Sequence, residues 1–200
     1  MKLNIHIVTH PIIQQLTSKL KNNSTNHIAQ DKTSQQLGIF LIYETIRNWL
    51  KNQELYIKNI YFIKRFILAN PKDSCMIITN IPQNFNLIQE VQGFIPNCQT
   101  VLVNICKADN GWQVNPLFNF IPSRINENKK IIILDKDLHL ETVIVLINYL
   151  TTNKHIKLSQ IRISSITCNI QTLQILSDKY PKLNIYTTEI ITDYKHSLAI

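Results

Sequence analysis

From residue 75 onward, short apolar runs alternate with stretches of helical spacing, and this alternation constrains the fold more than any other feature of the chain. The runs are rich in β-branched residues and read CMIITNI, TVLVNI, KKIIILD, IRISSIT and LNIYTTEI. Segments with helical spacing, such as ETVIVLINYL and NIQTLQILSDKY, follow two of them directly. Strands that alternate with helices favour a mostly parallel sheet covered on both faces. The sequence therefore predicts an α/β fold.

The first 50 residues predict helices. Pro11 suits a first helical position, and PIIQQLTSKLK spaces its apolar residues at helical intervals. After the polar break NNSTNH, residues 27–50 place apolar side chains along one stripe, which predicts a single long helix.

Two further segments favour extended structure. Residues 54–68 are rich in aromatic and β-branched residues and favour strands. The segment WQVNPLFNFI is interrupted by Pro116 and is typical of an extended arm or hairpin. With 200 residues, 44% of them hydrophobic, the chain is large enough to bury one core. We expect one domain over 1–200, with a helical part at 1–50, an α/β core at 54–200 and an arm at about 112–122.

The composition limits the cellular compartments in which the protein is expected. No segment approaches the ~20 consecutive apolar residues that cross a bilayer, and the N-terminus lacks the pattern of a signal peptide. The four cysteines contain no C-x-x-C pair, which favours free thiols in a reducing compartment over a disulfide or a metal site. Abundant isoleucine, asparagine and lysine are typical of an AT-rich genome, such as that of an organelle or a reduced bacterium. We expect a location in the plastid stroma or the cytoplasm, and no secretion.

The net charge of +8 makes nucleic acid a conceivable partner. The basic residues are nevertheless spread along the chain as KLK, KNIYFIKR, ENKK and HIK, with no cluster of five or six. Scattered lysine is more typical of a solvated surface than of a binding stripe. Nucleic acid and membranes are therefore unlikely partners.

The strongest candidate site is the segment IIILDKDLHLET, where an apolar strand meets Asp135, Lys136, Asp137 and His139. Ligands of parallel sheets bind beyond the carboxyl ends of the strands, where these acids could bind ribose hydroxyls or Mg²⁺. The alternative is a plain helix start, because acids are favoured near the positive end of the helix dipole. None of the three glycines follows a strand at such an end, so the chain lacks the residues for a glycine-rich phosphate loop. No metal site is expected.

Four segments in order resemble the uracil phosphoribosyltransferase family. VTHPIIQQLTSKLKN is similar to the family's opening, where a His-Pro pair begins a helix. STNHIAQDKTSQQLGIFLIYETIRN resembles the next helix, with its Tyr-Glu pair at Tyr43 and Glu44. NPLFNFIPSRI resembles the arm segment, and KYPKLNIYTTEI the strand before the base-binding loop. The resemblance implies a type I phosphoribosyltransferase fold, with a mostly parallel sheet flanked by helices, N-terminal helices and an extended β-arm.

The family transfers ribose 5-phosphate from phosphoribosyl pyrophosphate to uracil, usually with Mg²⁺ and as homodimers or larger assemblies. Its donor loop reads approximately D-P-M-x-A-T-G-G, which corresponds here to DKDLHLET. Asp135 is kept, while Lys136 replaces the proline and Leu140 the phosphate-binding threonine. Glu141 and Thr142 replace the two glycines, and Glu141 brings negative charge to the phosphate position.

The other substrate contacts also depart from the family. In its P-I-L-R-A-G motif, Pro82 replaces the pyrophosphate-binding arginine and Asn84 the glycine. Lys107 replaces a second donor-site arginine and loses its bidentate fork, and Phe120 replaces a lysine of the arm. The sequence ends at DYKHSLAI, about where the family's glycine-rich uracil loop would begin.

Three hypotheses follow. The first is a degenerate homologue that keeps the fold for a structural, regulatory or protein-binding role, needs no cofactor and forms a homodimer. The second is an active, divergent enzyme that makes uridine monophosphate, with Asp135 and Asp137 in catalysis, Lys107, Asp135 and Lys136 binding the donor, and Mg²⁺ accompanying it. The third is an RNA- or complex-associated basic protein.

Overall fold

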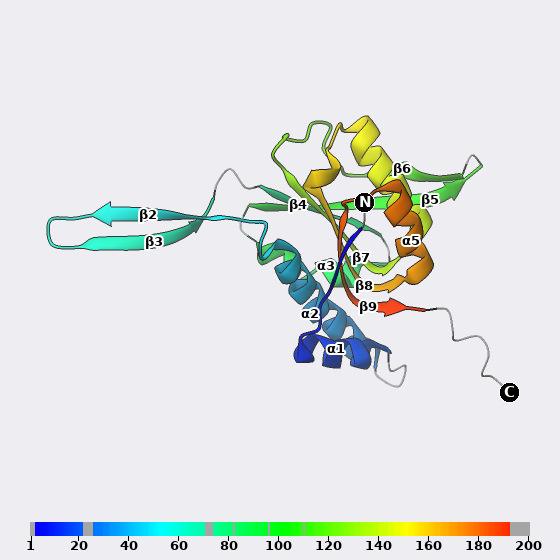
Figure 1. Cartoon of the computed structure of the whole chain (residues 1–200), viewed down its shortest axis with the longest axis horizontal. Helices are drawn as coiled ribbons and strands as arrows, with labels where there is room; N and C mark the ends of the chain where they lie inside the picture. The colour runs from blue at the N-terminus through cyan, green and yellow to red at the C-terminus, as the bar shows by residue number, and fades with distance from the viewer. Residues whose placement is uncertain are drawn as a thin grey trace.

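The computed structural model describes residues 3–21, 26–70, 74–81, 83–95, 97–109 and 111–192. Within these ranges, seven strands form one sheet in the order β1-β9-β8-β7-β4-β5-β6 (Figure 1). The strands are β1 (Asn4–Ile7), β4 (Cys75–Asn80), β5 (Cys98–Ala108), β6 (Gly111–Asn119), β7 (Lys130–Leu138), β8 (Ile161–Asn169) and β9 (Asn184–Ile191). Every neighbouring pair is parallel except β5 with β6. The predicted mostly parallel sheet is confirmed.

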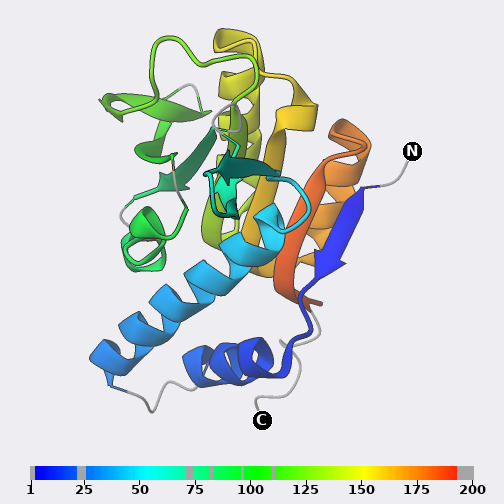
Figure 2. The ribbon, with the colours of Figure 1, turned by 90° about the vertical axis from the view of Figure 1, so that its left-hand side faces the viewer.

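Helices cover both faces of the sheet, as predicted. The helices are α1 (Pro11–Lys21), α2 (His27–Ile46), α3 (Phe85–Ile88), α4 (Leu140–Asn148) and α5 (Ile170–Lys179). Short 3₁₀ turns occupy Val91–Gly93 and Leu158–Gln160, and a π-helical turn, Tyr149–Asn153, continues α4. In Figure 2, α2 runs across one side of the sheet, with α1 beside it.

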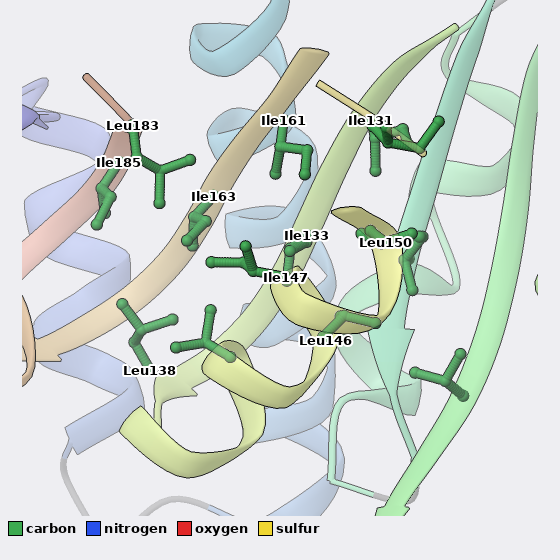
Figure 3. Packing of buried hydrophobic residues seen from close by; sticks show 14 of the residues in the cluster. Ile131, Ile133, Leu138, Leu146, Ile147, Leu150, Ile161, Ile163, Leu183 and Ile185 are labelled. Atoms are coloured by element: carbon green, nitrogen blue, oxygen red, sulfur yellow. The ribbon is translucent and has the colours of Figure 1, made fainter. Parts of the chain in front are cut away.

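The central strand β7 divides the core into two clusters because successive side chains of a strand point to opposite faces. Ile131 and Ile133 pack with residues of α4 and α5, including Leu146 (Figure 3). Ile132 and Leu134 pack with residues of α1, α2 and α3. A strand buried on both faces explains why KIIIL is a continuous apolar run rather than an alternating one.

The two strands predicted within residues 54–68 form a separate hairpin, β2 (Asn52–Lys58) and β3 (Ile63–Ala69). This hairpin projects away from the sheet (Figure 1), and every residue of β2 is exposed. For residues 112–122, approximately, the sequence predicts an extended arm or a hairpin, and the hairpin is what the structure shows. Residues 111–119 are the edge strand β6, antiparallel to β5 in the main sheet.

Pro116 does not end β6. Val103 of β5 pairs with Asn119, whereas Ile105 pairs with Val114, so β6 carries extra residues between these two points. Pro116 lies in this bulge, where a residue without an N–H group does not break a ladder hydrogen bond. The pattern alone could indicate extended backbone but not the strand that pairs with it.

Two features differ from expectation. The long helix ends at Ile46 rather than near Leu50. Strand β1 was not predicted, because its four residues are all exposed and form no apolar run. None of the helices in the described ranges is long and apolar enough to cross a membrane.

Candidate functional site

The predicted loop after Leu134 is instead a continuation of strand β7. Asp135 pairs with Ser165 of β8, and Asp137 with Thr167, so the strand runs on to Leu138. The acids remain in the ladder because β8 also extends, to Asn169, and supplies register partners for Asp135, Asp137 and Leu138. On the other side β4 stops earlier, and its last pair with β7 is Thr79 with Leu134. The strand edge beyond Leu134 therefore needs another partner on that side.

Asn84 supplies this partner. Its side-chain oxygen accepts a hydrogen bond from the Lys136 backbone N–H at 2.8 Å, and its amide nitrogen donates to the Asn80 carbonyl at 2.9 Å. Asn84 is 1% exposed. Sequence reasoning treated this position only as a lost glycine. The sequence did indicate this role, because the side chain of an asparagine just after a strand often forms hydrogen bonds with neighbouring backbone groups.

The carboxyl group of Asp135 is buried, with 7% exposure. Burial raises its pKa to about 6, although the hydrogen bond with Asn84, the charge of His139 and the Lys136 amide favour the ionised form. The neighbouring acid Asp137 adds to the increase. Asp135 is thus an acid turned toward the protein, with a proton affinity well above that of a solvated aspartate.

Asp137 differs because it is exposed and accepts a hydrogen bond from the Thr167 hydroxyl. It lines an open cavity of about 400 Å³ at the carboxyl ends of β7 and β8, beside the first residues of α4 and α5. The lining residues are Asp137, Leu138, His139, Leu140, Glu141, Thr167, Asn169, Gln171, Thr172, Ile175 and Ile191. Of the four residues expected to act in catalysis or donor binding, only Asp137 belongs to this lining, and Lys107, Asp135 and Lys136 do not. His139, which the sequence also placed in this segment, lines the cavity as well. Sequence reasoning did not identify Thr167 as a partner of Asp137.

A single residue, His139, connects β7 to α4. It has extended backbone, with φ −92° and ψ 129°, and α4 begins at Leu140. Thr142 donates its hydroxyl hydrogen to the His139 carbonyl at 3.1 Å, and Glu141 lies in the first helical turn. From 135 to 142 no residue has positive φ. An anion-binding loop alternates right-handed and left-handed backbone conformations, so that successive N–H groups point toward the phosphate. The backbone here lacks this alternation.

Charge in this cavity also disfavours an anion. Asp137 and Glu141 both line it, and two like charges about 4 Å apart repel by roughly 1 kcal/mol in water and by more when partly buried. The N-terminus of α4 would otherwise attract a phosphate. The side chain of Glu141 already places a negative charge at that end of the helix.

The fold does not place Lys107 beside Asp135 and Asp137. It is exposed on β5 and pairs in register with Trp112 of β6, while β4 lies between β5 and β7. Lys136 follows Asp135 directly and contributes its backbone N–H to Asn84. Phe120 follows β6 and is exposed. Pro82 and residues 193–200 lie outside the described residues.

The donor set fits a protein-held Mg²⁺ poorly. Mg²⁺ requires near-octahedral oxygen ligands, and the described residues contain no group of three or more His, Cys, Asp or Glu side chains that could hold a metal ion. The carboxylate of Asp137 already accepts a hydrogen bond from Thr167, and the side chain of Asp135 is buried.

Comparison with known proteins identifies the family. The family model described as uracil phosphoribosyltransferase matches residues 7–197. A uracil phosphoribosyltransferase homolog of Pyropia yezoensis is 30% identical, over 96% of this chain and 91% of the relative. The uracil phosphoribosyltransferase of Synechocystis is 23% identical, over 94% and 88%.

A solved structure, the AQ2163 protein of Aquifex aeolicus, has the same fold. It aligns with a TM-score of 0.78 and 17% identity, over 94% of this chain and 88% of that one. The helix-flanked, mostly parallel sheet is the type I phosphoribosyltransferase fold that the sequence resemblance implied. The chain belongs to the uracil phosphoribosyltransferase family.

Proposed function

We propose that this chain is a degenerate family member that keeps the fold for a structural, regulatory or protein-binding role and does not transfer ribose 5-phosphate. The observation that carries this proposal is the junction of β7 and α4. The strand continues through both acids, one extended residue leads into the helix, and Glu141 occupies the first turn. The donor reaction needs groups that bind a phosphate at this junction. The junction instead presents a carboxylate there. On this proposal the chain needs no cofactor.

A steady-state assay tests the proposal. The full chain is incubated with uracil, phosphoribosyl pyrophosphate and Mg²⁺, and uridine monophosphate is measured. The Synechocystis relative, which is named as a uracil phosphoribosyltransferase, serves as the positive control under the same conditions. We expect no product from this chain above the background without enzyme. Turnover at a rate typical of enzymes, roughly 1 s⁻¹ or more, would overturn the proposal.

The second candidate function is an active, divergent phosphoribosyltransferase. The buried Asp135 favours it, because a carboxyl group held at an energetic cost is more common at functional sites than elsewhere. On this alternative Asp135 and Asp137 bind the ribose of the donor, and Lys107 and Lys136 its phosphates. Millimolar donor with Mg²⁺ should then raise the melting temperature by mass action. The increase should vanish in Asp135→Asn, measured against that variant's own melting temperature, and no increase in the parent chain would exclude this alternative.

We further propose that the chain forms a homodimer. The support is the β2–β3 hairpin, which exposes large apolar side chains along its length and at its tip, where Tyr61 is 89% exposed. Contiguous exposed apolar surface of this kind usually marks an interface between proteins.

A plastid location is also proposed, since one relative, from Arabidopsis thaliana, is named as chloroplastic. Immunolocalisation in the source cells would test it.

A further inference from the structure

Cys75 and Cys98 lie side by side at the start of two neighbouring parallel strands. Cys75 begins β4 and Cys98 begins β5, and the two residues are register partners. Register partners of adjacent strands are about 4.8 Å apart, within the range of about 4.4–6.8 Å between the Cα atoms of a disulfide. Both side chains belong to the cluster beneath α1, α2 and α3, so they point to the same face of the sheet. Both cysteines are free thiols.

The two thiols differ in exposure and in charge. Cys75 is buried, whereas Cys98 is only partly buried. The neighbouring Cys75 thiol favours the thiolate of Cys98 and so lowers the pKa of Cys98; burial opposes this effect, and the ammonium group of Lys129 adds to it. The same interaction, followed by burial, raises the pKa of Cys75. Cys98 is thus the nucleophile that solvent can reach, and Cys75 is the partner that keeps its proton.

We propose that Cys75 and Cys98 are a modification site: they form a reversible disulfide in the folded chain when a small-molecule disulfide such as oxidised glutathione is in excess. In the first step the Cys98 thiolate attacks one sulfur of the oxidant, forms a mixed disulfide and releases one small thiolate. In the second step the Cys75 sulfur attacks the Cys98 sulfur, breaks the mixed disulfide and passes its proton to the departing thiolate. The two protein thiols are oxidised, and one small disulfide is reduced to two thiols.

The bond would act on the segment that borders the candidate site. It closes the loop from 75 to 98, which contains α3 and Asn84. Asn84 holds the Lys136 amide, next to Asp135. The disulfide would restrain the unfolded chain across this loop, and the melting temperature of the oxidised protein should rise by several degrees. This inference does not depend on whether the chain transfers phosphoribosyl groups.

Mass spectrometry of the full chain tests the site without any substitution. Incubation of the native protein with oxidised glutathione should remove the mass of two hydrogen atoms, and subsequent reduction should restore it. Cleavage after Lys72, Glu90 and Lys107, by trypsin with a glutamate-specific protease, separates the peptide of Cys75 from the peptide of Cys98. We expect these two peptides to be joined when the digest is not reduced.

The variant Cys106→Ser provides the matched control, because Cys106 lies on the same strand and in the same peptide as Cys98. The joined peptides should persist in Cys106→Ser and disappear in Cys98→Ser. Oxidation of denatured protein should instead join cysteines without this preference. Peptides joined through Cys106 or Cys168, a glutathione adduct at Cys98 that Cys75 does not resolve, or four thiols that remain free in the native protein would each overturn the proposal.

Discussion

The carboxyl group of Asp135 is held where its charge is costly. Burial raises its pKa from 3.8 to about 6, so the folded chain binds this proton more tightly than the unfolded chain does. Between about pH 4 and pH 6 the unfolded chain has released the proton while the folded chain keeps it. The free energy of unfolding therefore falls as pH rises through this window. Above pH 6 the whole penalty is present, and a shift of this size corresponds to about 3 kcal/mol.

Replacing Asp135 by Asn should remove this penalty, because an amide of the same shape carries no charge and keeps an acceptor oxygen. We expect Asp135→Asn to raise the free energy of unfolding at pH 7 by about 1–3 kcal/mol and to flatten its pH dependence between pH 4 and 6. Urea unfolding across this range measures both. Asp178→Asn, an exposed acid on α5, should change neither. Loss of stability in Asp135→Asn at pH 7 would contradict this account of the carboxyl group.

Asn84 should contribute stability through its two hydrogen bonds to backbone groups. Asn84→Ala leaves the Lys136 N–H and the Asn80 carbonyl without this partner at a buried position. Unsatisfied buried groups cost about 1–3 kcal/mol each, so we expect a loss of about 2 kcal/mol or more in urea unfolding. The neighbouring exposed residue gives the control, Gln83→Ala, which should change stability by less than about 0.5 kcal/mol. Equal effects of the two substitutions would show that the side chain of Asn84 stabilises nothing.

At the scale of elements, α2 approaches α3 closely at Gly38. A Cβ atom on Gly38 would lie 2.1 Å from the Leu87 carbonyl oxygen, whereas one on Gly93 would meet nothing within 4 Å. Gly38→Ala must therefore push α3 away from α2 and should lower the free energy of unfolding by about 2 kcal/mol. Gly93→Ala should be neutral or slightly stabilising, because it reduces the freedom of the unfolded chain. Thermal unfolding of the pair measures the difference, and similar melting temperatures would refute the close contact.

Most elements of the core could be predicted because their side chains are buried on one or both faces. The KIIIL run, for example, predicted a buried strand. The extension of β7 through Asp135 and Asp137 could not be predicted, because it depends on backbone partners from β8, far along the chain. The same limit applies to β1, which is exposed and is defined only by its pairing with β9. The lost glycines of the candidate site were evident in the sequence, but the role of Asn84 required the fold.

At the scale of the whole molecule, the projecting β2–β3 hairpin has two unlike faces. Register partners share a face, so Leu55 and Ile57 lie on one side with Phe66, Leu68, Gln53 and Lys64. Four of these six side chains are apolar, and this side is called the apolar face. The other side holds the ion pair of Glu54 with Arg65, together with Tyr56, Lys58, Ile63 and Ile67. An isolated two-stranded hairpin is marginally stable in water. An apolar face on such a hairpin is explained if a second copy of the chain covers it.

The two faces make the proposed homodimer testable by a matched pair of substitutions. Leu55→Glu places a charge on the apolar face, and Ile67→Glu places the same charge on the opposite face, where the side chain is also exposed. If the apolar face is the interface, desolvating the new carboxylate should disfavour association, and light scattering should report the mass of one chain for Leu55→Glu. The mass for Ile67→Glu should remain that of two. A concentration-independent monomer in the parent chain, or two chains in Leu55→Glu, would mean that this face has a different role.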